Sequence, residues 1–139
     1  MTIEADPIEL MKKSKSIAVV GVSARPNRPS YEVAEYLINA GYEVFLVNPR
    51  ETEILGREVY DSVSGLPKKV DIVDIFRKAT DVPPVVKDAI KAGAGAVWMQ
   101  LDIVNETAAN EAISAGLEVV MDRCTKIEHQ KISDMEQAE

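Results

Sequence analysis

The chain has 139 residues, of which 46% are hydrophobic and 28% charged, a balance that argues against a disordered chain and fits one domain with one core. A formal net charge of −7 argues against a general nucleic-acid binder, which would carry a basic surface. The longest apolar runs are well below the roughly 18 residues of a membrane span. With one cysteine, no internal disulfide can form, so we expect a cytoplasmic protein.

The chain begins with a predicted helix. Asp6 can accept hydrogen bonds from free backbone N–H groups and Pro7 suits the first helical position, so a helix should run over about 7–13. The aliphatic run at 16–20 then predicts a buried strand. The polar segment 21–30, rich in Gly, Ser, Arg, Asn and Pro, is expected to be a loop.

The middle of the chain begins with a helix that Ser30 is expected to cap and that Gly41 should end. A strand is predicted at 43–47. The stretch from there to about residue 67 looks irregular, with a short extended piece at Val59–Tyr60 and a helical turn at 62–66.

Strand and helix patterns alternate through the C-terminal half. Further strands are predicted at 70–75, 96–99 and 117–121. We expect one helix capped by Thr80 or Asp81, a second capped by Asn105, and a final helical stretch from about Thr125.

Short aliphatic strands that alternate with helices are typical of βαβ units, whose right-handed crossovers build a parallel sheet. We therefore predict an α/β fold, a Rossmann-like doubly wound parallel sheet of about five strands in the order 3-2-1-4-5, in three α/β/α layers. Residues 1–139 should form one domain, with a core over about 8–130 and a polar C-terminal tail. Ligands of such sheets bind at the carboxyl ends of the strands, where the strand order reverses, here between the first and fourth strands.

The loop after the first strand carries groups that suit a phosphate. Gly21 ends the strand where a phosphate would approach the backbone closely, and Val22 lies in the same turn. Ser23 adds a hydroxyl donor, and Arg25 and Arg28 add positive charge. The alternative is a plain strand-to-helix turn that needs one glycine.

The second strand ends in a cation where NAD-binding proteins place an acid. Ser23 and Pro26 replace two glycines of the G-x-G-x-x-G pattern, and the strand is followed by Asn48, Pro49 and Arg50. An arginine attracts a phosphate on the ribose, so Arg50 favours NADP or coenzyme A over NAD. A solvated surface charge is the alternative for Arg50.

Two further strand ends could line the same crevice. Phe76 can flank an adenine or a pantetheine arm, and Arg77 can reach a phosphate. Met99, Gln100 and Leu101 suit a narrow apolar slot with one amide. Packing in the core is the alternative for Phe76, Met99 and Gln100.

No catalytic group stands out. One histidine and one cysteine cannot assemble a His/Cys zinc site, and His129 is expected to be a solvated helix residue. Cys124 should border the crevice, where Arg123 would favour the thiolate and a mixed disulfide with a thiol-bearing ligand, unless it is a small packing residue. Asp71 and Asp74 have no visible basic partner in the sequence.

Six segments in chain order resemble the small CoA-binding protein family, the stand-alone relatives of the N-terminal CoA-binding domain of the succinyl-CoA synthetase α subunit. These segments are residues 17–23, 28–31, 47–49, 73–77, 97–101 and 120–124. The resemblance covers about residues 8–130 and implies coenzyme A bound across the strand ends. The candidate cofactor-binding residues are Gly21, Val22, Ser23, Arg25, Arg28, Ser30, Asn48, Pro49, Arg50, Phe76, Arg77, Met99 and Gln100, with no metal ligand among them.

The resemblance also bears on activity. The synthetases transfer phosphate through a histidine in a further domain, which we do not find in this sequence. We therefore expect a protein that binds coenzyme A or acyl-CoA without catalytic machinery of its own. An NADP-dependent oxidoreductase and a CoA-sensing regulatory subunit of a partner enzyme are the alternatives. The expected partner is a small-molecule nucleotide, neither nucleic acid nor a membrane, while a protein partner or a homo-oligomer stays open.

Overall fold

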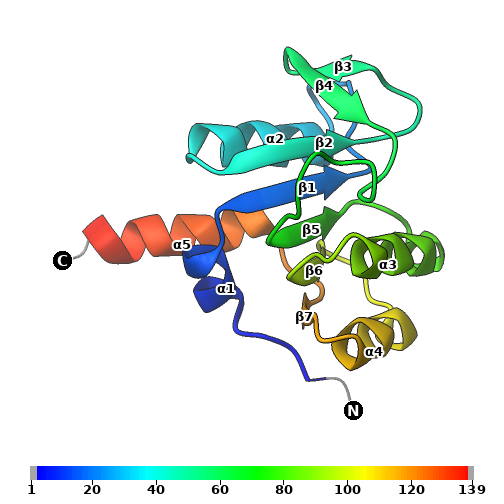
Figure 1. The fold of residues 1–139 in the computed structure, drawn as a ribbon. Coiled ribbons are helices and arrows are strands. Elements are labelled where there is room, and N and C mark those ends of the chain that lie inside the picture. Colours follow the sequence, from blue (N-terminus) through cyan, green and yellow to red (C-terminus); the bar gives the residue numbers. More distant parts are fainter. Residues whose placement is uncertain (1–2, 138–139) are drawn as a thin grey trace.

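The computed structural model describes residues 3–137, whose centre is a seven-stranded sheet (Figure 1). Its strands are β1 (Ser16–Val20), β2 (Glu43–Val47), β3 (Glu53–Ile54), β4 (Arg57–Tyr60), β5 (Ile72–Ile75), β6 (Ala96–Met99) and β7 (Glu118–Val120). They lie in the order β3-β4-β2-β1-β5-β6-β7. Every neighbouring pair is parallel except β3 and β4, which are antiparallel.

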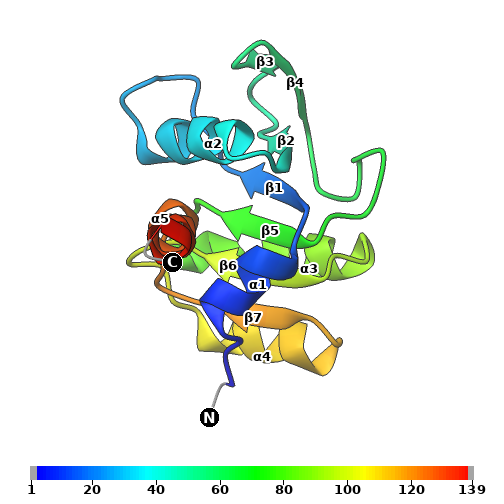
Figure 2. The ribbon, with the colours of Figure 1, turned by 90° about the vertical axis from the view of Figure 1, so that its left-hand side faces the viewer.

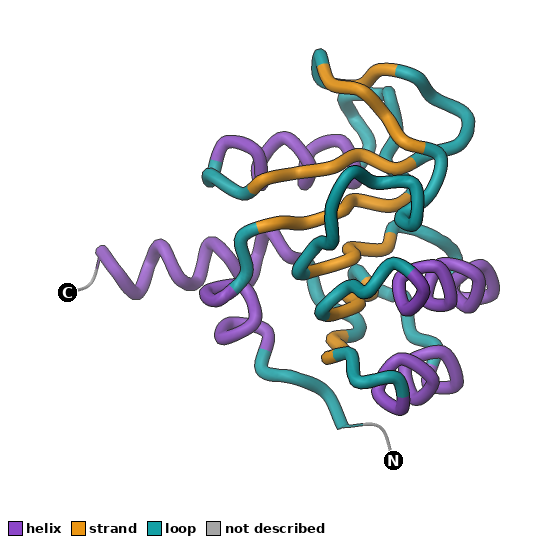
Figure 3. Tube along the Cα trace, viewed as in Figure 1, coloured by secondary structure: helices purple, strands orange, loops and turns teal. Residues whose placement is uncertain are grey.

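Helices cover both faces of the sheet (Figures 2 and 3). They are α1 (Pro7–Lys13), α2 (Pro29–Asn39), α3 (Val82–Lys91), α4 (Glu106–Ser114) and α5 (Thr125–Gln137), with a 3₁₀ turn, η1 (Ala79–Asp81), before α3. α1, α2 and α5 pack on one face, and α3 and α4 pack on the other. Among residues 3–137, no helix combines the length and the apolar character that a membrane crossing needs.

Side chains alternate between the two faces along each central strand. In β1, Ile17 and Val19 contact the layer of α1, α2 and α5, whereas Ala18 and Val20 contact the layer of α3 and α4. Since both faces are buried, the strand reads as a continuous aliphatic run, which is why the sequence predicts it.

The predicted three-layer parallel α/β fold is confirmed, with seven strands where about five were expected, but the positions predicted for the strands after β2 were wrong. β5 lies beside β1, where the strand at 96–99 was expected, and β6 lies one position further out. The position on the far side of β2 is taken by β4, which contains the short extended piece predicted at Val59–Tyr60. Counted with β4, the six parallel strands have the order 3-2-1-4-5-6, so the reversal lies between β1 and β5.

The expectation that Ser30 caps α2 was wrong. Pro29 is the first helical residue, and Arg28 holds the N-cap position without a side-chain hydrogen bond. Ser30 lies inside the first turn, where its Oγ accepts a hydrogen bond from the backbone N–H of Ser23 at 2.9 Å. Ser30 therefore ties the start of α2 to the loop after β1.

The other predicted helix starts had mixed outcomes. The side chains of Asp6 and Asn105 cap α1 and α4 as expected. Asp81 holds the N-cap position of α3 but makes no side-chain cap, because η1 leads directly into that helix. Residues 62–66 form the turn predicted there, with hydrogen bonds from the N–H of Gly65 to the carbonyl oxygen of Ser62 and from the N–H of Leu66 to that of Val63.

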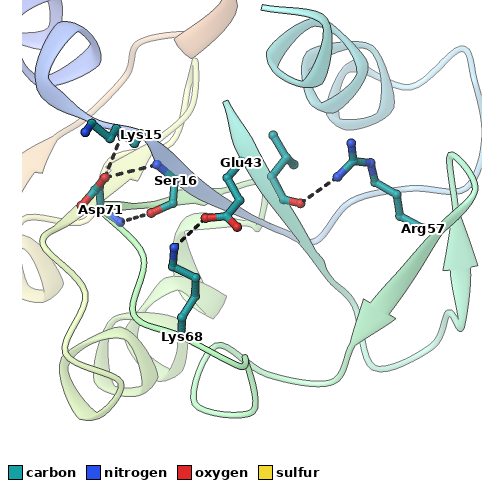
Figure 4. A network of polar contacts seen from close by, with 7 residues as sticks. Lys15, Ser16, Glu43, Arg57, Lys68 and Asp71 are labelled. Atoms are coloured by element: carbon teal, nitrogen blue, oxygen red, sulfur yellow. Dashed lines mark hydrogen bonds and ion pairs between the residues drawn. The ribbon is translucent and has the colours of Figure 1, made fainter. Parts of the chain in front are cut away.

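Asp71 joins the amino ends of β1 and β5 (Figure 4). Its Oδ2 accepts hydrogen bonds from the backbone N–H groups of Lys15 at 2.7 Å and Ser16 at 3.2 Å. The backbone N–H of Asp71 donates in return to Ser16 Oγ at 3.0 Å. Asp71 thus has a structural role at the end of the sheet opposite the strand ends that the sequence singled out.

Gly21 is required by the packing of the chain itself. It follows β1 with φ +86°, a conformation that favours glycine, and its N–H donates to the carbonyl oxygen of Val47 at 2.9 Å. A Cβ on Gly21 would collide with the backbone carbonyl oxygen of Phe76. The loops after β1 and β5 therefore touch at this residue.

We predict that Gly21→Ala lowers the free energy of unfolding by at least about 2 kcal/mol, because it adds a collision to a strained backbone conformation. The matched control is Gly41→Ala, since Gly41 has φ +101° but nothing within 4 Å of an added Cβ. The control should cost only about 1 kcal/mol. Urea denaturation measures both, and equal losses would show that the contact with Phe76 adds nothing.

Candidate ligand-binding site

A cavity of about 770 Å³ opens at the carboxyl ends of the central strands. Its walls come from the loop after β1, the first turns of α2, and the segments after β5, β6 and β7. The volume lies in the range of small-molecule sites. The predicted residues that line it are Gly21, Ser23, Arg25, Arg28, Ser30, Phe76, Arg77 and Gln100.

The other predicted residues do not line this cavity. Val22 and Met99 are fully buried, and Met99 packs on the face of α3 and α4. Asn48, Pro49 and Arg50 form the turn after β2. A role for any of these residues in ligand binding stays a prediction.

The turn after β2 is nevertheless attached to the wall of the cavity. Asn48 Nδ2 donates to the carbonyl oxygen of Val22 at 2.8 Å, while Asn48 Oδ1 accepts from the backbone N–H of Arg50 at 2.9 Å. One amide side chain therefore holds the backbone of Arg50 beside the loop after β1. Arg50 itself is exposed.

The loop after β1 is fixed by its own hydrogen bonds. Ser23 Oγ accepts from the backbone N–H of Arg25 at 3.1 Å, and the backbone N–H of Arg28 donates to the carbonyl oxygen of Arg25 at 3.0 Å. Together with the bond between Ser23 and Ser30, these contacts order the segment that carries both arginines. Such order lowers the entropy cost of binding.

Positive charge gathers at the end of the cavity that is formed by the segments after β1 and β5, which are neighbours in the sheet. Arg25, Arg28, Arg77 and Lys78 line this end, and the one carboxylate of the cavity, Asp102, comes from the segment after β6. None of the four cations forms an ion pair among the residues that the structure describes. A cluster of uncompensated cations in a cleft attracts anions strongly, and it is unusual in a chain of net charge −7.

The opposite end is formed by the segments after β6 and β7, and most of its apolar lining was predicted from the sequence. Leu101, Ile103 and Cys124 line it, and Cys124 is 9% exposed. The expectation that Cys124 borders the crevice is therefore confirmed. Two of the lining residues that were missed from the sequence are Lys78 and Ile103. Lys78, at the charged end, directly follows Arg77, so the sequence contained a signal for it. Ile103 does not directly follow a predicted strand, and the sequence contained no signal for it.

A buried polar network lies behind the cavity wall. Gln100 Nε2 donates to Asp74 Oδ1 and, at 3.1 Å, to Thr125 Oγ1. The hydroxyl of Thr125 donates to Asp74 Oδ2 at 2.8 Å. Burial raises the pKa of the fully buried Asp74 to about 7, although both hydrogen bonds act to lower it.

His129 lies outside this cavity, and the expectation that it is solvated was wrong. It is partly buried on α5, with Nδ1 2.7 Å from Tyr36 Oη and its ring edge-on to those of Tyr36 and Tyr42. Burial raises the pKa of Tyr42 to about 12. No group of three or more metal-ligating side chains occurs between residues 3 and 137.

Comparisons with known proteins show the family to which this chain is related. The CoA binding domain family matches residues 15–130. The uncharacterized protein YneT of Bacillus subtilis (strain 168) is 37% identical over 126 residues, which cover 91% of this chain and 93% of YneT. The solved structure of a hypothetical protein from Pyrococcus horikoshii OT3 has a TM-score of 0.87 and 41% identity, over 91% of this chain and 89% of that chain.

A ligase subunit is a more partial match. The alpha subunit of ADP-forming acetate–CoA ligase I from Pyrococcus furiosus is 38% identical over 96 residues. These residues are 65% of this chain but only 21% of the ligase subunit. The similarity therefore concerns one part of a much longer protein.

We predict that Asp74 makes stability depend on pH. Its pKa rises from 3.8 to about 7 on folding, so between these values the folded protein holds a proton that the unfolded chain has released. This contribution is complete below about pH 4 and is lost as the pH rises to about 7, on the order of 4 kcal/mol in total. Asp74→Asn has no titrating group at this position.

Urea denaturation of the wild type and Asp74→Asn at several pH values between about 4 and 7 measures this effect. The free energy of unfolding of the wild type, minus that of the variant, should fall steadily across this window. A difference that stays constant with pH would contradict the assignment of the shifted group.

Proposed function

The chain belongs to the CoA binding domain family, and from this we propose that it binds coenzyme A or an acyl-CoA in the cavity at the carboxyl ends of its strands. The observation that carries the proposal is the cluster of Arg25, Arg28, Arg77 and Lys78, which lack carboxylate partners among the described residues. Coenzyme A combines a diphosphate and a ribose phosphate with a long uncharged arm. A cavity charged at one end and apolar at the other suits that combination.

The order of the strands supports a direction for the ligand. Because the sheet runs β2-β1-β5-β6-β7, the segments that carry Arg50, Gly21, Arg77, Gln100 and Cys124 follow one another along its carboxyl edge. We infer that the adenosine lies toward Arg50 and the diphosphate lies at the loop after β1. The pantetheine arm then runs toward Cys124.

The proposal is a binding function and not ligation. The ligase name belongs to a subunit of which this chain matches about a fifth of the length. The residues that line the cavity offer phosphate recognition and an apolar slot, so we assign them the role of holding the ligand. A location in the cytoplasm is part of the proposal, since a reducing compartment keeps the thiol of coenzyme A free.

A panel of ligands in a thermal-shift titration tests the proposal. Coenzyme A should raise the melting temperature most, 3′-dephospho-CoA less, and NADPH and NADH little, because stabilisation follows affinity. In Arg50→Ala, coenzyme A and 3′-dephospho-CoA should give equal shifts if Arg50 holds the ribose phosphate. A large shift with NADPH and none with coenzyme A would favour an NADP-dependent protein.

Single arginine variants test the cation cluster directly. Arg28→Ala and Arg77→Ala should each weaken coenzyme A binding about 10–100-fold, since a charge-assisted hydrogen bond contributes roughly 1.5–3 kcal/mol. Lys91→Ala removes the same charge from an exposed site at the end of α3, outside the cavity, and should leave the Kd unchanged. Isothermal titration calorimetry measures the Kd of all three variants. If Lys91→Ala weakens binding as much as the two arginine variants do, binding depends on the overall charge of the protein and not on the cluster.

A further inference from the structure

Gln100 is held in one orientation by buried partners. The residue is 4% exposed and directly follows β6. An amide nitrogen has two hydrogens to donate, and Gln100 Nε2 has two acceptors, Asp74 Oδ1 and Thr125 Oγ1. Both donors are therefore satisfied inside the protein.

The reversed amide would be unfavourable. It would place Gln100 Oε1 against an oxygen of Asp74, which repels it whenever the carboxyl group is ionised, and it would take a donor away from the buried Asp74. The hydroxyl of Thr125 donates to Asp74 and so does not offer its hydrogen to Oε1. With Asp74 ionised, the network thus selects the orientation in which the nitrogen points inward.

The carbonyl oxygen of the amide is left for the cavity. Oε1 accepts none of the side-chain hydrogen bonds formed among residues 3–137, and no buried side-chain polar atom in that range lacks a partner. Gln100 lines the cavity between the charged and the apolar ends, next to Leu101 and Ile103. An acceptor is therefore offered to a ligand in a largely apolar part of the wall.

We propose that Gln100 is a specificity-determining residue whose Oε1 accepts a hydrogen bond from an amide N–H on the uncharged arm of the ligand. Asp74 and Thr125 are positioning residues that aim this oxygen. The inference rests on the proposed function and deepens it, since it assigns a hydrogen-bond acceptor to the pantetheine arm. A ligand segment without an N–H would leave the oxygen unpaired in an apolar slot, which is costly.

Two probes separate the arm from the phosphates. Coenzyme A has both, whereas adenosine 3′,5′-bisphosphate keeps the nucleotide phosphates and lacks the arm. By calorimetry, Gln100→Leu should weaken coenzyme A binding about 3–10-fold, the value of one neutral hydrogen bond, and leave adenosine 3′,5′-bisphosphate unchanged. Thr125→Val, which is nearly isosteric and removes one of the two acceptors, should show the same pattern with a smaller loss.

Asp74 provides the matched pair of variants. Asp74→Asn keeps an oxygen that can accept from Gln100, so it should retain the affinity for coenzyme A, whereas Asp74→Leu removes the acceptor and should behave like Gln100→Leu. The inference is overturned if Gln100→Leu binds coenzyme A as tightly as the wild type, or weakens both probes equally. A wild type that binds no coenzyme A would instead overturn the proposed function, and this inference with it.

Discussion

The close approach between the Gly21 backbone and the carbonyl group of Phe76 is the constraint on which the site depends. It joins the loops after β1 and β5 at the point where the strand order reverses. From there the loop 21–30 leads into α2, and the bond from the Ser23 N–H to Ser30 Oγ holds it against the helix start. The walls of the cavity are therefore set by backbone packing before any ligand arrives.

The cations that line the cavity determine which kind of ligand it attracts. The chain as a whole is acidic, yet Arg25, Arg28, Arg77 and Lys78 line one space without carboxylate partners in the described part of the chain. Such cations repel one another and have no ion pair in the described part of the chain, which supports the proposal of a phosphate-bearing ligand. The apolar end and the fixed amide of Gln100 then restrict what the rest of the ligand can be.

The sequence predicted the layered parallel fold because buried strands are continuous aliphatic runs. It did not predict the place of β4, a short strand between β3 and β2 that carries polar residues and has no such run. Met99 and Gln100 were predicted to line the same slot, although neighbouring side chains along a strand point to opposite faces of the sheet. Only the packing of α2 and α5 shows which face holds the cavity. Asp74 and Thr125 are 51 positions apart in the sequence, so no local sequence pattern could predict the hydrogen bond between them.

The most direct test of the account is an NMR measurement of the arginine side-chain Nε–Hε groups during titration with coenzyme A. The signals of Arg25, Arg28 and Arg77 should shift as their guanidinium groups meet phosphate. The signal of Arg57, at the amino end of β4 and outside the cavity, should stay in place. If no cavity arginine shifts at saturating coenzyme A, or Arg57 shifts as far as they do, the cations are not the phosphate site.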